Sequence, residues 1–393
     1  MAIIGGLSSH NSKQMPHILN IYKMAQISYG SFDPALKDKV QFPSVYRMIP
    51  NESAQYVAIV KLLKHFGWTW IGLLVSDDDS GAMLLKALIL RLLQSSICLA
   101  FSEILPTVNK HWEGGNIQEV PFNDKLSKIH LILSSTDTNV ILVHGDSRSM
   151  EGLRVILYFN EFVEMKPTEK VWIITVQWDF ASTISKDFFT PSSFNGTLSF
   201  ALPTKEVEGY VQYLNKINPK ENYFAAVLWA NAFQCSFPQH THDIHSLNTS
   251  NCTGEEKLSS LPESVFEMRM SGQSYSIYNA VYAVAHALHA MFSSRSKYKA
   301  WGDGITWNLQ NIHPWQLHSF LKHIHFNNSA GEEIFFDENG ELGTGYDIIN
   351  TVTFPNQSIR RVRIGWTDPQ APEGKDVIIQ QNSILWNHIF IKV

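Results

Sequence analysis

Short polar clusters follow several apolar runs in this sequence, and they contain the residues whose types and spacing could do chemistry. The clearest is SDDDSG, Ser76 to Gly81, which ends the apolar run TWIGLLV. A second cluster, GLSSH, covers Gly6 to His10 at the end of AIIGG. Carboxylates and hydroxyls at such places can cap a helix, bind a divalent cation or contact a ligand. The elements that position them decide between these roles.

Apolar runs alternate with helical patterns over the first half of the chain. The spacing predicts helices between strands, and the strands cover residues 2–6, 25–29, 44–50, 69–75, 97–105, 139–145 and 170–178. These strands are apolar throughout, which is typical of strands buried on both faces of a parallel sheet. Strand and helix in alternation predict a doubly wound α/β lobe.

The second half has a different pattern. Helical spacing dominates residues 206–326, and turn clusters in residues 332–366 predict antiparallel hairpins. The most apolar helical candidate, residues 276–292, contains Asn279 and two histidines and is shorter than a bilayer span of about 20 residues, so we interpret it as a buried helix. At 393 residues the chain fits two lobes, with more than one crossing between them.

Ligands of an open parallel sheet bind beyond the carboxyl ends of its strands, where helix N-termini point backbone N–H groups outward. SDDDSG lies at such an end, and we interpret it first as the cap of the next helix and second as the lip of a cleft. A metal site would need oxygen ligands from other loops, so none is predicted. The hydroxyls of GLSSH suit a carboxylate as well as a helix cap.

Motifs for enzymatic chemistry are missing from the sequence. It has no G-x-S-x-G, G-x-x-x-x-G-K-[ST], H-E-x-x-H or G-x-G-x-x-G pattern, so neither catalysis nor a cofactor is predicted. The histidines of HTHDIH (240–245) and HSFLKHIH (318–325) are interpreted as polar surface residues. FDENGE (336–341) lacks the residue order of a calcium loop and predicts a hairpin turn.

Charge, cysteines and sequons narrow the class of protein further. The 31 basic and 36 acidic residues give a net charge of −5 without basic blocks, so nucleic acid is not a predicted partner. Three cysteines are too few for a disulfide scaffold and lack zinc-like spacing. The N-terminus shows no signal peptide. Six N-x-S/T sequons nevertheless favour a secreted history, and they begin at Asn51, Asn195, Asn248, Asn251, Asn327 and Asn356.

Seven segments occur in a familiar order along the chain. They are QISYGSFDPALKDKVQFPSVYRMIPNE, LLKHFGWTWIGLLVSDDDSG, ICLAFSEILP, NVILVHG, VWIITVQWDF, FDENGELGTGYDIIN and SILWNHIFIKV. Together they closely resemble the extracellular ligand-binding region of vomeronasal type 2 receptors, which are class C G-protein-coupled receptors related to the calcium-sensing and metabotropic glutamate receptors. The resemblance covers essentially all 393 residues.

The resemblance implies an α/β fold of the periplasmic-binding-protein-like (type I) Venus-flytrap class, a two-lobed clamshell with parallel sheets flanked by helices. Lobe 1 would comprise residues 1–50 and 200–345. Lobe 2 would comprise residues 51–199 and 346–393, with the final residues returning towards lobe 1. Family members also carry a signal peptide and further strand–helix units before the counterpart of AIIGGLSS. After the counterpart of IKV they have a cysteine-rich domain and a seven-helix membrane domain, so this chain resembles a truncated form.

The implied function is that of a chemosensory, pheromone-type receptor region on the extracellular side of the plasma membrane. A peptide, protein or small-molecule chemosignal would stabilise lobe closure, and signalling would pass through a lobe-1 dimer, homomeric or heteromeric, to a membrane domain that engages a G protein. The alternative is a truncated, non-signalling or decoy product, or a pseudogene-like remnant. A third reading, a small-molecule hydrolase, has no nucleophile–base pair to support it.

The cysteine roles carry over from the family one by one. Cys235 and Cys252 correspond to the pair that closes a surface loop of lobe 1, which is worth about 2 to 4 kcal/mol. Cys98 corresponds to the cysteine that family members bond to the cysteine-rich domain, so it is expected to be a free thiol here.

The ligand site carries over in part. In amino-acid-sensing relatives, hydroxyls at the positions of Ser9 and Phe32 hold the ligand carboxylate. An aromatic at the position of Ser80 and acids at those of Glu52 and Val176 hold its ammonium. Only Ser9 and, approximately, Glu52 keep this chemistry, and a receptor for peptides or proteins would not need the full set. The residues expected to line the cleft are Ser9, Ser31, Glu52, Asp79, Ser80 and Gln177, with Phe32 and Val176 at the family's remaining positions.

Overall fold

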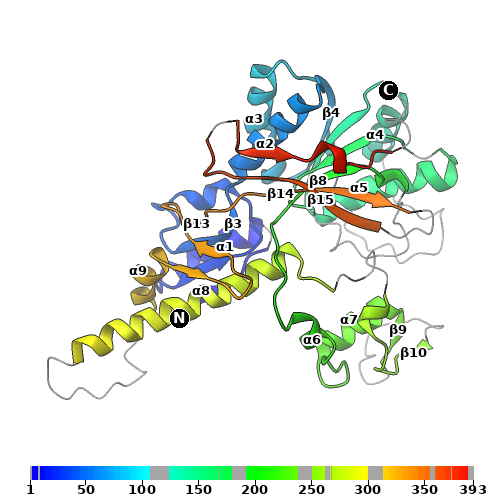
Figure 1. The fold of residues 1–393 in the computed structure, drawn as a ribbon. Helices are drawn as coiled ribbons and strands as arrows, with labels where there is room; N and C mark the ends of the chain where they lie inside the picture. The colour runs from blue at the N-terminus through cyan, green and yellow to red at the C-terminus, as the bar shows by residue number, and fades with distance from the viewer. Residues whose placement is uncertain are drawn as a thin grey trace.

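The computed structural model divides most strands of the chain between two sheets, a small one and a large one (Figure 1). Short two-stranded sheets and helices fill the segments between them. The structure describes residues 2–7, 9–106, 124–166, 168–178, 192–237, 250–261, 266, 268–299, 313–354, 359–372 and 374–387.

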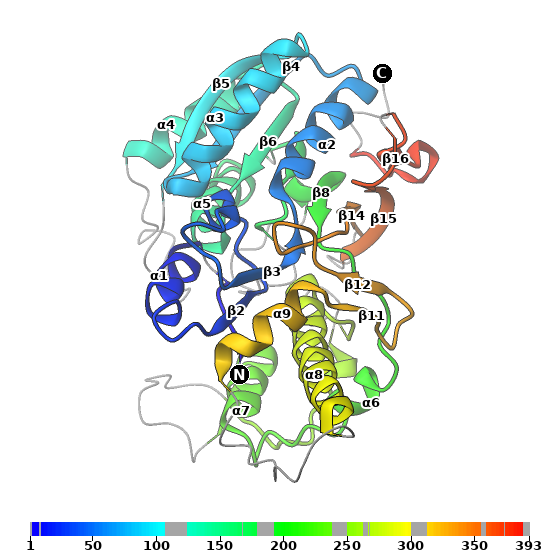
Figure 2. The ribbon, with the colours of Figure 1, turned by 90° about the vertical axis from the view of Figure 1, so that its left-hand side faces the viewer.

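The small sheet has the strand order β1-β2-β3-β13, and its strands are parallel. They are β1 (Ala2–Ile4), β2 (Ala25–Ser28), β3 (Val45–Pro50) and β13 (Glu341–Leu342). Helix α1 (Ser9–Leu19) follows β1, while α8 (Gly272–Lys299) and α9 (Leu317–Lys322) lie side by side against the sheet (Figure 2). Three alanines of α8 form part of this contact, and their small side chains let the helix approach the strands closely: Ala280, Ala283 and Ala287.

The large sheet has eight strands in the order β16-β15-β14-β8-β7-β6-β4-β5. The five strands from β5 to β8 are parallel, and the three from β14 to β16 are added antiparallel. The strands are β4 (Trp70–Ser76), β5 (Cys98–Leu105), β6 (Val140–His144), β7 (Val171–Ile174), β8 (Thr197–Ala201), β14 (Asp347–Thr353), β15 (Ile359–Thr367) and β16 (Val377–Ile379). Its helices are α2 (Glu52–His65), α3 (Asp79–Gln94), α4 (Asp124–Ser135) and α5 (Ser147–Tyr158), which continues as a π-helical turn, Phe159–Val163.

Successive residues of the central strands pack into two different cores, which explains why these strands are apolar throughout. On β7, Val171 and Ile173 join the core that contains apolar residues of α2 and α3. Trp172 and Ile174 join the core that contains apolar residues of α4 and α5. A strand covered by helices on both faces needs apolar side chains at every position. The edge strand β5 differs, because only its last residue, Leu105, is buried.

The chain passes between the two sheets three times: after β3, after β8 and after β13. An antiparallel hairpin predicted within residues 332–366 is present as β14 with β15. A second antiparallel pair, β11 (His325–Asn327) with β12 (Glu333–Phe335), begins before that range. FDENGE forms a turn, because Gly340 donates from its backbone N–H to the carbonyl of Asp337 and the flanking residues Phe336 and Leu342 form an antiparallel bridge.

Besides β11 and β12, the segment between β8 and β13 contains four further elements that belong to neither main sheet. They are α6 (Tyr210–Leu214), α7 (Tyr223–Phe233), β9 (Cys235–Ser236) and β10 (Ser250–Asn251). The prediction that residues 276–292 form a buried helix is only half right. One face of α8 is buried, whereas Ile277 and Val281 are 37% and 50% exposed on the other. Within the described residues, no helix combines the length and apolarity needed to cross a membrane.

Candidate functional site

The residues expected from the sequence to line a cleft all lie just beyond the carboxyl ends of parallel strands. Ser9 begins α1 after β1, Glu52 begins α2 after β3, and Asp79 with Ser80 begins α3 after β4. The others lie in the loops after β2 and β7: Ser31, Phe32, Val176 and Gln177. This edge is where α/β sheets bind ligands.

Two hydroxyls meet at the small sheet. The Oγ atoms of Ser9 and Ser31 lie 3.5 Å apart, and Ser31 is fully buried. Its backbone N–H donates to Oγ of Ser28, which fixes the start of the loop after β2. Two neighbouring hydroxyls beside the start of a helix can donate to a carboxylate, although only Ser9 of this pair belongs to the GLSSH pattern. Ser8, the other hydroxyl of that pattern, lies outside the described residues.

Glu52 provides a buried carboxyl group at the start of α2. It is 2% exposed, and loss of hydration raises its pKa to about 7 despite the hydrogen bond from Tyr56 and the positive charge of Arg47. Nε2 of Gln177 lies 3.4 Å from Oε1, whereas Oε2 is buried with no hydrogen-bond partner in the described part of the chain. A buried acceptor without a donor is costly, so this oxygen is a natural place for a ligand cation.

Asp78 and Asp79 have different roles in the acidic cluster. Oδ1 of Asp78 accepts from the backbone N–H of Gly81, so the predicted helix cap is confirmed. Asp79 is 85% exposed, and its Oδ2 lies 3.5 Å from Nζ of Lys13 in α1. Lys13 also lies 2.6 Å from Asp33, whose side chain is fully buried after β2. Lys13 therefore connects helices that flank the two sheets.

Ser80 contacts a histidine that the sequence reading missed. Its Oγ lies 3.1 Å from Nε2 of His144, at the end of β6, and Nδ1 of His144 lies 3.0 Å from Oγ1 of Thr175. The structure thus brings a hydroxyl and an imidazole together without any sequence motif that indicated the contact. Burial lowers the pKa of His144 to about 4, and a hydroxyl takes the place where a catalytic carboxylate would stabilise the imidazolium. This arrangement orients Ser80 and makes His144 a poor general base.

Phe32 and Val176 are packed into the protein in this conformation. They are 3% and 2% exposed, and the ring of Phe32 lies 6.5 Å from that of Tyr346 between centroids. The Tyr346 hydroxyl donates to the carbonyl of Pro50 at the crossing after β3. Neither side chain offers hydrogen bonds, so they can contribute only apolar contact.

A buried ion pair supports the small-sheet side of the site. Arg47 on β3 pairs with Glu341 on β13, and it also donates over 2.9 Å to the carbonyl of Asp33. Both charged side chains are at most 2% exposed. No sequence pattern indicated this pair, because the two residues lie on strands at opposite ends of the chain.

Among the residues that the structure describes, the histidine and acidic motifs do not assemble a metal centre. Within the described ranges, no group of three or more His, Cys, Asp and Glu residues could hold an ion. Residues 240–245 of HTHDIH lie outside those ranges. In HSFLKHIH the histidines face separate partners: His318 the Lys23 carbonyl, His323 the Ser319 carbonyl, and His325 the Glu333 carboxylate.

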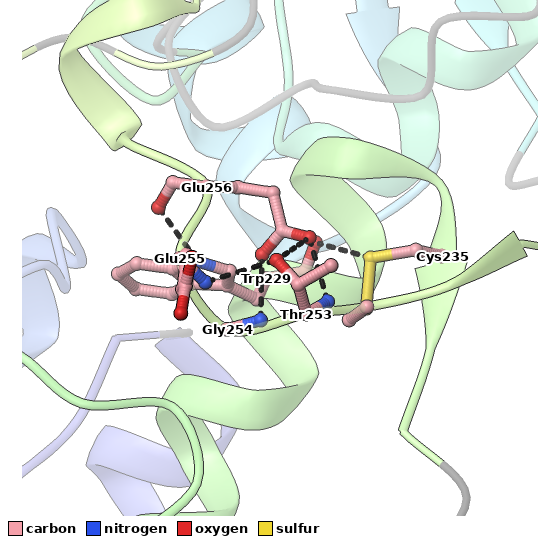
Figure 3. The surroundings of a disulfide bond; sticks show 7 residues. Trp229, Cys235, Thr253, Gly254, Glu255 and Glu256 are labelled. Carbon is pink, nitrogen blue, oxygen red and sulfur yellow. Dashed lines mark hydrogen bonds between the residues drawn. A yellow bond between two sulfur atoms is a disulfide. The ribbon is translucent and has the colours of Figure 1, made fainter.

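A disulfide joins Cys235 and Cys252 across β9 and β10, as the family resemblance implied (Figure 3). The loop after it is held by Glu256, whose carboxylate accepts from the backbone N–H groups of Thr253 and Gly254. The Glu256 carbonyl accepts from the indole N–H of Trp229 over 3.1 Å. Cys98 on the edge strand β5 is exposed and unpaired.

Comparison with known proteins agrees with this architecture. Residues 1–353 match the family described as "Receptor family ligand binding region". The chain is 28% identical to the human extracellular calcium-sensing receptor, over 98% of this chain and 36% of that receptor. It is 32% identical to mouse vomeronasal type-2 receptor 26 over 85% of this chain and 37% of that receptor, and 27% identical to rat taste receptor type 1 member 2 over 89% and 38%.

The chain belongs to the receptor family ligand-binding region, in the form found in class C G-protein-coupled receptors. It spans a little more than a third of the length of these relatives.

Proposed function

We propose that this chain is the ligand-binding region of a chemosensory, pheromone-type receptor on the extracellular side of the plasma membrane. The observation that carries the proposal is the buried Glu52 carboxyl group, whose Oε2 has no partner among the described residues at the ligand-binding edge of the strands. Sequence relatives with the same region include vomeronasal type-2 receptors.

The ligand we propose is a peptide with a free amino group. Its ammonium group pairs with Glu52 and Gln177, because a cation would supply the donor that Oε2 lacks. Its carboxylate or a backbone carbonyl accepts from Ser9 and Ser31. Ser80, oriented by His144, adds a further hydroxyl at the end of β4.

Ligand binding is proposed to act through lobe closure. The small sheet is the core of lobe 1, which comprises residues 1–50 and 200–345. The large sheet is the core of lobe 2, which comprises residues 51–199 and 346–393. Ser31 and Glu52 are almost completely buried in this conformation, so a ligand reaches them only when the lobes separate. A ligand that contacts both lobes then favours the closed form by its differential affinity, with Lys13 and Asp79 meeting as the lobes close.

In the intact receptor, closure passes through a lobe-1 dimer to a membrane domain that engages a G protein. Glycans at exposed sequons fit an extracellular location, and two of the described sequon asparagines, Asn251 and Asn327, are exposed. Asn51 and Asn195 accept hydrogen bonds within the fold, and Asn248 and Asn356 lie outside the described residues.

A library of short peptides with free amino termini, compared with the same library acetylated, tests the proposal. Peptides that bind should raise the melting temperature of the purified chain, and acetylation should remove most of the shift. Glu52→Gln and Ser9→Ala should weaken binding, whereas Glu338→Gln, an exposed acid in the FDENGE turn, should not. Hits that bind equally well to all three variants would overturn the assignment.

A further inference from the structure

A separate pocket lies between α2 and the hairpin of β15 and β16. It has a volume of about 420 Å³, within the range of small-molecule sites. One wall is the face of α2 formed by Ala54, Val57 and Lys61, which follow each other at helical spacing. The opposite wall contains Thr367 and the hairpin residues Asp368, Pro369, Ala371, Asp376 and Val377.

The hairpin wall is anchored to the rest of the protein. Nζ of Lys61 lies 2.6 Å from both carboxylate oxygens of Asp376, which ties α2 to the loop just before β16. The backbone N–H of Asp368 donates to the carbonyl of Asp376 over 2.8 Å and closes the loop. Oγ1 of Thr367 accepts from the backbone N–H of Tyr346 in the buried interior. The pocket is therefore built from fixed elements on both sides.

Charge and polarity of the lining residues indicate the ligand. Ala54 and Val57 on one wall and Val377 on the other supply apolar surface. Lys61 neutralises Asp376, whereas Asp368 is exposed and its carboxylate accepts from the backbone N–H of Gln370. One lysine against two aspartates leaves the lining with one negative charge in excess.

We propose that this pocket binds a small organic cation with an apolar body, of the arylalkyl ammonium class. The apolar body lies on Ala54 and Val57, and the ammonium group lies beside Asp368. Such a site follows the usual pattern of ligand pockets, in which apolar residues supply area and a few polar groups fix the orientation.

This pocket is distinct from the site around Glu52, although both use α2. Ala54 follows Glu52 by two residues, which places the two side chains about 200° apart around the helix axis. Glu52 points into the buried interior, whereas the face of Ala54, Val57 and Lys61 borders the open pocket. Binding here does not depend on the ligand proposed for the cleft.

Ligand-observed NMR titrations with three matched probes test the inference: phenethylammonium, 2-phenylethanol and phenylacetate. We expect the cation to bind about two- to fivefold more tightly than the neutral alcohol, as suits one partly exposed charge pair, and the anion to bind most weakly. Asp368→Asn should remove the preference for the cation and leave the alcohol unchanged. Ala54→Phe and Val57→Phe should each fill the pocket and weaken both probes at least tenfold.

Two further variants separate this site from the cleft. Glu338→Gln, a control outside the pocket, should bind all probes as the wild type does, and Glu52→Gln should still bind the cation here. Thermal melting shows whether Ala54→Phe and Val57→Phe fold. If one of them does not fold, the other tests whether filling the pocket weakens binding. The proposal is wrong if no probe binds to saturation or if the cation binds no more tightly than the alcohol. It is also wrong if Glu52→Gln abolishes binding of the cation while a folded Ala54→Phe or Val57→Phe variant still binds it.

Discussion

Gln177 donates a hydrogen bond over 3.4 Å to the buried carboxyl group of Glu52, so the loop after β7 meets the first turn of α2. The contact is long, and the second carboxyl oxygen has no partner among the described residues. The protein therefore maintains an incompletely satisfied acid at the edge where parallel strands end. A site that needs a ligand to complete its hydrogen bonds would have this geometry.

Glu52→Gln should stabilise the protein above neutral pH. Between pH 4.5 and about 7 the folded state keeps a proton on Glu52 that the unfolded state releases, so burial of this group makes the free energy of unfolding fall as the pH rises. Glutamine is neutral and removes this loss. We expect the variant to be about 2 to 3 kcal/mol more stable than the wild type at pH 8, with a much smaller difference at pH 4. Urea unfolding at both pH values measures this, and equal differences would contradict it.

His144 should have the opposite pH dependence. Its pKa is lowered to about 4, so between pH 6.5 and 4 the unfolded state takes up a proton that the folded state refuses, and stability is lost as the pH falls. His144→Gln should cost about 1 to 2 kcal/mol at pH 7 through its hydrogen bonds to Ser80 and Thr175, and should remove the acid sensitivity.

The two groups offset each other where their windows overlap, between pH 4.5 and 6.5. Each single variant should therefore show a steeper pH dependence in this range than the wild type does, with opposite signs. Parallel curves for the wild type and both variants would show that neither group titrates as proposed.

Lys13 and Asp79 should differ sharply in their contribution to stability. Lys13→Met leaves the buried carboxylate of Asp33 without its cation and should cost about 2 to 4 kcal/mol. Asp79 is exposed, so Asp79→Asn should change stability by less than about 0.5 kcal/mol. Urea unfolding compares the two variants, and a larger loss for Asp79→Asn would show that the ion pair across the helices matters more than the buried one.

Removing the disulfide should destabilise the segment around α7. Cys235→Ala with Cys252→Ala opens a loop with a sequence separation of 17, which should cost about 3 kcal/mol. Cys98→Ala is the matched control, because this exposed thiol has no disulfide partner. Equal free energies of unfolding for the double variant and for Cys98→Ala would contradict a stabilising role of the disulfide.

The sequence predicted those parts of the fold whose cause is local. The strand β7 could be recognised because both of its faces are covered by helices, so each of its residues had to be apolar. Asp78 could be predicted as a cap because capping involves only the next few residues. The prediction of a buried helix over residues 276–292 is only half right, because only one face of α8 packs on the sheet.

Contacts between distant residues could not be predicted in the same way. Arg47 and Glu341 pair because β3 and β13 are neighbours in the small sheet, and that neighbourhood depends on the whole topology. The sequence predicts Ser80 as a cleft residue, but its partner His144 lies at the end of another strand and belongs to no motif. The contacts of Lys13 with Asp33 and Asp79 could not be predicted either, because the three residues lie on different elements that only the folded topology brings together.

The distance between the two sheets, measured with and without a peptide, tests the central claim most directly. One spin label on the native Cys98 of β5 and another on an exposed α9 position, through Lys322→Cys, would report on the large and small sheets by double electron–electron resonance. We predict a broad or double distance distribution without ligand, which narrows to the shorter distance when a peptide from the library binds. An unchanged distribution with the peptide bound at saturation would contradict a receptor region that closes on its ligand.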